Sequence, residues 1–156
     1  MPLHVEVVAA ERPILDQDVD EVLATTTQGQ VGILPRHAPM LTLLAPGAVR
    51  LRRGDDETVL AVGGGFLEVS ANRVVILADS AERAEEIDIA RAEEARRRAA
   101  ERVAARAPDI DQERAQAALA RSLARIRAVE RVRRRGGRTR PGPSGVSEAG
   151  VAGDEA

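Results

Sequence analysis

The sequence predicts an α+β fold, in which an N-terminal β-sandwich or flattened barrel is followed by a C-terminal antiparallel two-helix hairpin. Between Leu3 and Ala78 the chain consists of short apolar runs separated by Gly, Pro, Asn and Asp, which is typical of a many-stranded β-domain. Between Glu82 and Arg135 there is no glycine and a single proline. Alanine, arginine and glutamate dominate that second part, and all three favour helices.

The β-domain is expected to contain six short strands and a fixed corner. The corner lies between Gly29 and Leu41, because glycine there permits unusual backbone angles and two prolines fix φ. Arg53-Gly54-Asp55-Asp56 and Ala71-Asn72-Arg73 have the residues of hairpin turns. The expected strands are Leu3–Val8, Val19–Thr25, Ala48–Arg52, Thr58–Val62, Phe66–Val69 and Val74–Ala78.

The two helices are expected at Ile89–Arg106 and Ile110–Arg135, with Asp109 as the cap of the second. Their apolar faces consist largely of alanine, which buries little area, so we expect a loosely held hairpin that can change its packing. The remaining chain is rich in Gly, Pro and Ser and is expected to be disordered. The predicted domains are residues 1–83, 84–135 and 136–156.

Composition narrows the chemistry that this chain can perform. Its 156 residues suit one compact domain with an appendage, and the formal net charge is -2. The absence of cysteine excludes disulfides and thiolate sites, and the absence of lysine excludes Schiff-base chemistry. No segment approaches the length of an apolar membrane span, so we expect a cytosolic protein or one held at a membrane through a partner.

Neither a catalytic site nor a metal site is expected. His4 and His37 are the only histidines and belong to no cluster of ligands at metal-site spacing. Gly63-Gly64-Gly65 precedes a strand, whereas a phosphate loop needs a helix, so we interpret the glycines as a bulge or a close approach of two backbones. We therefore expect no enzymatic activity and no obligatory cofactor.

The corner from Gly29 to Leu41 closely resembles a signature of the epsilon subunit of bacterial F-type ATP synthases. Gly63–Val69, Val74–Asp79 and Ile87–Ala92 match the same family in the same order. The resemblance implies a non-catalytic rotor subunit of the central stalk of a proton-translocating synthase. Its β-sandwich would bind the gamma subunit and the membrane c-ring, as a peripheral protein on the cytoplasmic face of the bacterial plasma membrane.

The resemblance also implies regulation. In that family the C-terminal helices switch between a compact state and an extended state that inhibits ATP hydrolysis, which requires two states separated by a few kcal/mol. Ile87-Asp88-Ile89-Ala90-Arg91-Ala92 matches the I/L-D-x-x-R-A motif by which some members bind ATP, although Asp88 is equally explained as a helix cap. The implied residues for ATP as a regulatory ligand are Glu82, Ile87, Asp88, Arg91, Ala92, Arg98, Arg121 and Arg125.

Arginines dominate the end of the second helix. Between Arg121 and Arg140 there are nine arginines and only one acidic residue, Glu130. The run is explained as a solvated face, as a reader of nucleic-acid phosphates, or as a match to an acidic protein surface. The net acidic charge and the single aromatic residue argue against nucleic-acid binding, which is the alternative function. The resemblance favours the beta subunits of the alpha/beta catalytic head, contacted by Arg127, Arg131, Arg133 and Arg134.

Overall fold

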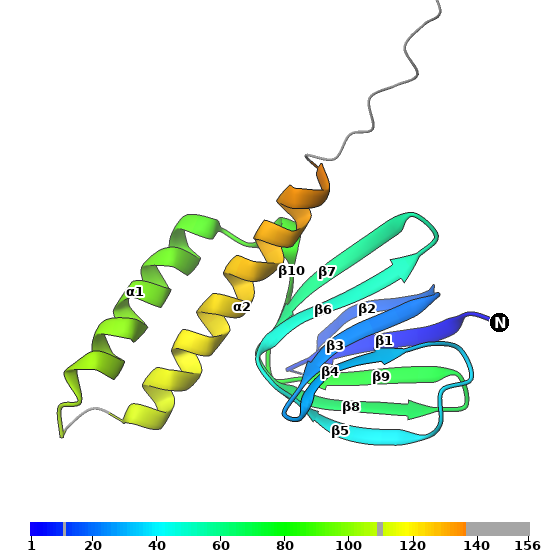
Figure 1. The fold of residues 1–156 in the computed structure, drawn as a ribbon, viewed down its shortest axis with the longest axis horizontal. Coiled ribbons are helices and arrows are strands. Elements are labelled where there is room, and N and C mark those ends of the chain that lie inside the picture. Colours follow the sequence, from blue (N-terminus) through cyan, green and yellow to red (C-terminus); the bar gives the residue numbers. More distant parts are fainter. Residues whose placement is uncertain (11, 109–110, 137–156) are drawn as a thin grey trace, which may run out of the picture.

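The computed structural model describes residues 1–10, 12–108 and 111–136, and within them ten strands precede two helices (Figure 1). The α+β fold predicted from the sequence is confirmed. The strands are β1 (Leu3–Ala9), β2 (Arg12–Val19), β3 (Glu21–Thr26), β4 (Gly29–Ile33), β5 (Met40–Leu44), β6 (Gly47–Arg53), β7 (Asp56–Val62), β8 (Gly65–Ser70), β9 (Arg73–Ala78) and β10 (Ala81–Arg83). A 3-10 turn, η1 (Ala84–Glu86), leads into the helices α1 (Ile89–Ala105) and α2 (Gln112–Gly136).

The strands form one sheet that folds back on itself as a nearly closed sandwich. The strand order is β10-β7-β6-β3-β5-β8-β9-β1-β2, and β4 pairs with β3. β1 and β9 are parallel, whereas the other paired strands run antiparallel. Arg83 on edge strand β10 donates from Nη2 to the carbonyl oxygen of Ile14 on edge strand β2 at 3.3 Å. This contact joins the two edges across the gap in the sheet.

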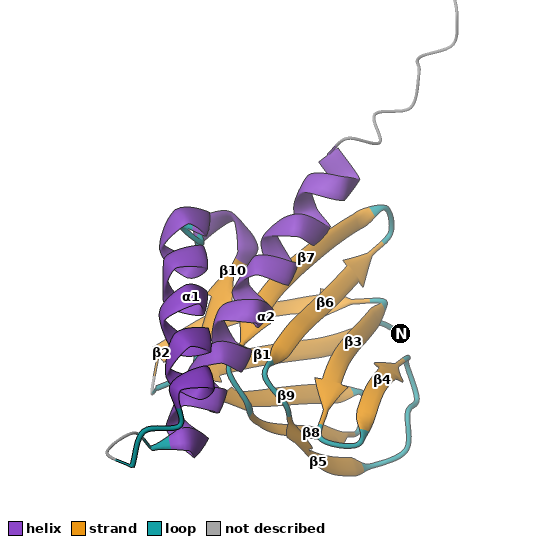
Figure 2. Cartoon of the chain, turned by 60° about the vertical axis from the view of Figure 1, so that its left-hand side comes forward, coloured by secondary structure: helices purple, strands orange, loops and turns teal. Residues whose placement is uncertain are grey.

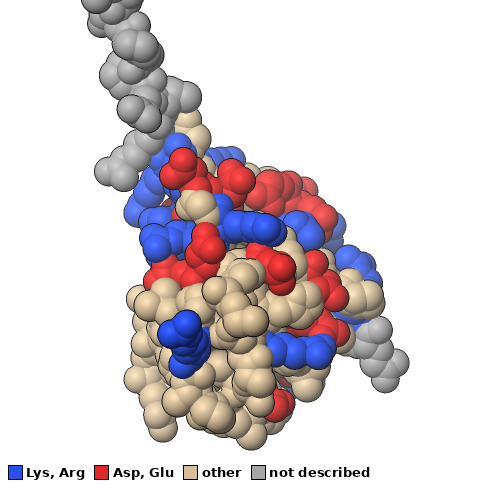
Figure 3. All heavy atoms as spheres, turned by 90° about the vertical axis from the view of Figure 1, so that its right-hand side faces the viewer, with Lys and Arg blue, Asp and Glu red and all other residues tan. Residues whose placement is uncertain are grey.

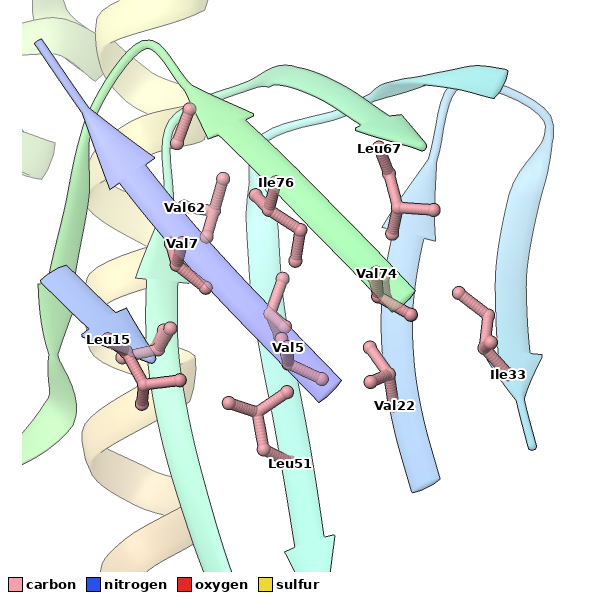
Figure 4. Close-up of a cluster of buried hydrophobic side chains, with 14 of the residues drawn as sticks. Val5, Val7, Leu15, Val22, Ile33, Leu51, Val62, Leu67, Val74 and Ile76 are labelled. Atoms are coloured by element: carbon pink, nitrogen blue, oxygen red, sulfur yellow. The ribbon is translucent and has the colours of Figure 1, made fainter. Parts of the chain in front are cut away.

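The core lies between the two layers of the sandwich, where branched side chains from both layers interdigitate (Figure 4). Strand β1 illustrates why these residues form it, since Leu3, Val5 and Val7 point inward with no exposed surface while the residues between them are half-buried. Burying each such side chain stabilises the fold by roughly 1.5–3 kcal/mol. The core is almost purely aliphatic, as the composition requires.

The predicted turns and the glycine interpretation are confirmed. Gly54 adopts a φ of 58° between β6 and β7, and Ala71 and Asn72 have φ of 50° and 61° between β8 and β9, as a type I′ turn requires. A Cβ on Gly65 would lie 2.1 Å from the carbonyl oxygen of Leu77, so the backbones of β8 and β9 approach too closely for any side chain.

Four strands were not among the six expected, and two of them, β4 and β5, overlap the corner predicted from Gly29 to Leu41. The expected strand at Val19–Thr25 was wrong at its start, because Val19 ends β2 and the chain turns at Asp20 before β3 begins. β2 was missed because Pro13 and several polar residues interrupt its alternation. β10 was missed because three residues, Ala81–Arg83, carry no periodicity.

The helices lie within a few residues of their expected bounds. Asp88 caps α1, and its Oδ1 accepts hydrogen bonds from the backbone N–H of Ala90 at 3.1 Å and Arg91 at 3.2 Å. Asp111 caps α2 by accepting from the N–H of Arg114 at 3.1 Å. The predicted cap Asp109 and the tail beyond Gly136 lie outside the described residues.

α2 is wedged between α1 and the sandwich, with β6 and β7 on its other side (Figure 2). Alanines contribute to both of its contacts, and Ser122, Ile126 and Val129 are also buried. Ala115 and Ala124 are buried, and Ala128 has no exposed surface where it packs with Val59 and Ala61 of β7. The second contact of α2, with β6 and β7, was not predicted from the sequence, because arginines as well as small side chains form it.

Candidate functional site

A cleft of about 370 Å³ opens where β10, η1, α1 and α2 meet. Seven of the eight residues implied for ATP binding line it. The eighth, Arg121, does not, and its Cδ lies 3.1 Å from the position of a Cβ on Gly63, at the edge of the sandwich. The seven residues brought together are Glu82, Ile87, Asp88, Arg91, Ala92, Arg98 and Arg125.

Ion pairs already occupy much of this cleft. Nε of Arg125 lies 2.6 Å from Oε2 of Glu82, which joins α2 to β10. Nη1 of Arg98 lies 2.9 Å from Oε1 of Glu94, one turn earlier on α1. Asp88 is used as the cap of α1. Two of the arginines that a nucleotide would need, Arg98 and Arg125, are therefore held by carboxylates of this chain.

The balance of charge in the cleft is slightly acidic. Three arginines line it beside four carboxylates, those of Glu82, Glu86, Asp88 and Glu94. Arg91 makes no ion pair within the described residues, whereas Arg98 and Arg125 can bind a polyphosphate only by exchanging their carboxylate partners for phosphate oxygens. Binding of a polyphosphate in this cleft would therefore rearrange the ion pairs of Arg98 and Arg125.

A second ionic cluster fastens the C-terminal end of α2 to β7. The side chain of Glu57 is 1% exposed, and it accepts hydrogen bonds from Arg50 on β6 and from Arg131 and Arg135 on α2. Burial alone would raise the pKa of Glu57, but the three arginine hydrogen bonds outweigh burial and lower the pKa from its ordinary 4.5 to about 2. Glu57 therefore stays ionised at any physiological pH.

The four arginines implied as beta-subunit contacts have different environments. Arg131 is committed to Glu57, with Nη2 at 3.2 Å from Oε2. Arg134 lies 3.8 Å from Glu130 on its own helix. Arg127 and Arg133 are exposed and make no ion pair within the described residues. Arg127, Arg131 and Arg134 also line a cleft of about 400 Å³ between α2 and the sandwich.

The outer face of β5, β8 and β9 carries an exposed apolar row that the sequence analysis did not identify. Leu43 pairs with Phe66, and Phe66 pairs with Leu77, so the three side chains project from one face of neighbouring strands. They are 49%, 51% and 54% exposed, and Leu41 on the same face is 71% exposed. A contiguous patch of this kind is typical of a protein-binding surface.

The charged side chain of Glu68 lies on the same face as the apolar row, exposed on β8 opposite Leu41. Figure 3 shows charged side chains gathered over the upper part of the face that it presents, whereas most of the lower part is uncharged. Alternation along each strand could have shown the outward apolar residues, but only the strand pairing aligns them into one row.

His4 occupies a site that the sequence analysis assigned to no chemistry. Its Nδ1 lies 2.9 Å from Asp18 and its Nε2 lies 2.7 Å from Asp16, both on the neighbouring strand β2. The hydrogen bond to Asp18 raises the pKa of His4, assisted by the negative charge of Asp16. No group of metal-binding side chains occurs in the part of the chain that the structure describes. No helix among residues 1–10, 12–108 and 111–136 has the length and hydrophobicity of a membrane span.

Models of two protein families match consecutive parts of this chain. Residues 2–84 match the β-sandwich domain of the ATP synthase delta/epsilon chain. Residues 85–130 match the long alpha-helix domain of the same chain. The junction between the matches falls within η1, directly after β10.

Two relatives and one solved structure illustrate the similarity. The chain is 57% identical to an ATP synthase epsilon chain of Chloroflexus aurantiacus over 96 residues, 62% of this chain and 69% of the relative. It is 47% identical to that of Chloroflexus aggregans over 130 residues, 83% of this chain and 94% of the relative. A chain in the structure of the Euglena gracilis mitochondrial ATP synthase, comprising OSCP, F1 and c-ring, shares the fold with a TM-score of 0.62 at 22% identity, over 86% of this chain and 81% of the other.

Proposed function

Because the chain belongs to the family of ATP synthase delta/epsilon chains, we propose that it is a non-catalytic rotor subunit of the central stalk of a proton-translocating F-type synthase. In this role it couples the gamma subunit to the c-ring and regulates ATP hydrolysis through its C-terminal helices. It reaches the cytoplasmic face of the bacterial plasma membrane only as a peripheral part of that complex.

The observation that carries the docking proposal is the apolar row of Leu43, Phe66 and Leu77. The outer face of β6 and β7 is covered by α2, whereas the outer face of β5, β8 and β9 remains exposed. The gamma subunit is the proposed occupant of the apolar row, because the family's sandwich domain docks on the rotor. The corner, with Leu34 56% exposed, is the proposed contact to the c-ring.

The docking proposal is tested by binding the full chain to purified gamma subunit from the same organism. Replacing both Leu43 and Phe66 by Ser removes two exposed apolar side chains without opening the core. We expect the affinity to fall about a hundredfold, as for truncated interface hot spots. The control replaces the exposed Ala104 and Ala105 of α1 by Ser and should leave binding unchanged. Equal affinities of the two variants would move the gamma contact to another face.

The regulatory part of the proposal places ATP in the cleft at the base of the hairpin. Its support is that seven of the eight implied residues surround one space, with Arg91 exposed beside it. Arg98 and Arg125 would turn from Glu94 and Glu82 to the phosphates, where bidentate, charge-assisted bonds form. Bound ATP would then hold α1 and α2 together and favour the compact state over the inhibitory extended state.

Isothermal titration of ATP into the full chain tests this regulatory site. We expect saturable binding with a micromolar to millimolar Kd, lost in Arg91→Ala and in Arg125→Ala. Arg97→Ala is the matched control, because Arg97 is exposed on α1 and does not line the cleft. Equal binding by all three variants would show that ATP binds elsewhere, and the absence of heat from the unmodified chain would remove ATP as the regulator.

A further inference from the structure

We propose that Glu57 anchors an ionic latch, formed with Arg131 and Arg135, that docks α2 on the sandwich and withholds these arginines from acidic partners. The latch deepens the proposed regulation and rests on it for its role in the complex. The docking itself is a property of the isolated chain. It differs from the ATP cleft, because Glu57 and both of its α2 arginines lie at the other end of the α2–sandwich contact.

The geometry concentrates the contact on one carboxylate. Arg131 and Arg135 are four residues apart, so both project from the same face of α2 toward β7. Both bind Oε2 of Glu57, whereas Oε1 is bound by Arg50 from β6. Arg135 also donates from Nη2 to the carbonyl oxygen of Asp55 at 2.7 Å, at the β6–β7 turn. Four hydrogen bonds thus join or orient the two elements around a single buried group.

The rest of the contact between α2 and the sandwich offers little competing stabilisation at this end. Ala128 supplies the buried apolar surface there, with Val132 half-buried beside it. Docking also buries Nε of Arg131, which has no hydrogen-bond partner within the described residues and so costs free energy. Charge-assisted hydrogen bonds to a carboxylate that is 1% exposed are the contacts strong enough to offset this cost.

The latch makes Glu57 an internal substitute for an acidic partner surface. While α2 is docked, Arg131 and Arg135 are consumed by Glu57, and an external carboxylate must displace Glu57 before it can bind them. When α2 leaves, Glu57 remains paired with Arg50 alone. An acidic partner surface must therefore compete with Glu57 for the two arginines. It releases α2 from the sandwich only when its affinity for them exceeds that of Glu57.

The docked and undocked populations can be measured in the full chain by pulsed dipolar spectroscopy. The chain contains no cysteine, so spin labels attach only at introduced sites. Ser70→Cys lies on the exposed face of the sandwich, and Gly136→Cys ends α2 with open space around its Cβ. We expect one narrow distance distribution in the parent chain, and a second, long distance whose population rises about tenfold in Glu57→Gln. Raising the salt concentration from about 0.05 M to about 1 M should also favour the long distance.

Matched controls separate the latch from net charge. Asp56→Asn removes the same charge from the neighbouring residue, which is exposed and makes no ion pair in the described chain, and it should leave the distances unchanged. Arg131→Gln with Arg135→Gln should reproduce Glu57→Gln, and adding Glu57→Gln to this pair should have little further effect. Arg97→Gln with Arg102→Gln removes equal charge from exposed positions of α1, outside the latch, and should leave the distances unchanged.

Binding of poly-L-glutamate supplies a second readout. We expect Glu57→Gln to bind it about tenfold more tightly than Asp56→Asn, because the two variants have equal net charge but only the first frees the arginines. Equal affinities, or distance distributions of Glu57→Gln that superimpose on those of Asp56→Asn, overturn the proposal. If Glu57→Gln fails to fold by circular dichroism, the paired arginine variants decide alone. Neither measurement contains gamma subunit, so failure of rotor docking leaves both results unaffected.

Discussion

Glu57 on β7 and Arg131 on α2 are 74 residues apart in the chain, yet Oε2 of the first lies 3.2 Å from Nη2 of the second. The contact therefore joins the β-sandwich to the helical hairpin through two residues that are far apart in the sequence. It also explains why a carboxylate with a 1% exposed side chain is tolerated. Arg50, Arg131 and Arg135 compensate the negative charge that water would otherwise solvate. The cluster leads directly to a dependence of stability on pH.

The first prediction concerns acid stability. The pKa of Glu57 is lowered from 4.5 to about 2, so the ionised cluster stabilises the fold above pH 4.5 and the stabilisation is lost as the pH falls toward 2. The shift corresponds to at most about 3 kcal/mol at neutral pH. Urea unfolding at a series of pH values should show the parent chain and Glu57→Gln converging across this window. If the difference in unfolding free energy between the parent chain and Glu57→Gln stayed constant from about pH 5 to about pH 2, the assigned pKa would be wrong.

The second prediction concerns His4. Asp18 and Asp16 raise its pKa above 6.5, so the imidazolium form stabilises the β1–β2 contact below pH 6.5 and this contribution disappears as the pH rises through the higher folded pKa. An NMR titration of the imidazole protons should give a midpoint above 6.5. Asp18→Asn should lower that midpoint by removing the hydrogen bond that contributes most. A midpoint that Asp18→Asn does not move would show that the two side chains are separate in solution.

The third prediction separates the two roles of Asp88. As a cap its Oδ1 accepts two backbone N–H groups, so Asp88→Ala should reduce stability by about 1 kcal/mol. Asn is an equally good cap, so Asp88→Asn should retain the stability while removing the charge. Thermal unfolding measures the cap, and an ATP titration of the same two variants measures the ligand role. Equal ATP affinity of the Asn variant and the parent would mean that Asp88 acts only as a cap.

Sequence patterns predicted this fold well where the signal is local. Hairpin turns, the glycine contact and the helix positions follow from backbone requirements of Gly54, Asn72, Gly65 and the uninterrupted run after Glu82. β10 could not be predicted in this way, because its three residues become a strand only through pairing with β7.

The ionic contacts were harder still to predict from the sequence. Glu57 is one of several acids near the β6–β7 turn, and nothing in its neighbours distinguishes it from Asp55 or Asp56. Its choice as the buried partner depends on strand alternation and on the docking angle of α2. The same holds for Arg121, which periodicity places with Arg125 on one face of α2, although the contact with Gly63 directs it away from the ATP cleft. Tertiary packing therefore decides which of several similar charged residues forms a given ion pair.

The fourth prediction concerns Ala128, which has no exposed surface and packs with Val59, Ala61 and Ala84. The close approach of α2 to β7 requires a small side chain here, so Ala128→Leu should force the helix away at a cost of about 1–3 kcal/mol. Leucine is a good helix former, and α2 should therefore stay helical by circular dichroism while its amides exchange faster. Gln116→Leu, at an exposed position of the same helix, is the control. If Ala128→Leu retained the exchange protection of this control, the sandwich would accommodate a larger side chain at this contact, and the predicted requirement for a small residue would be wrong.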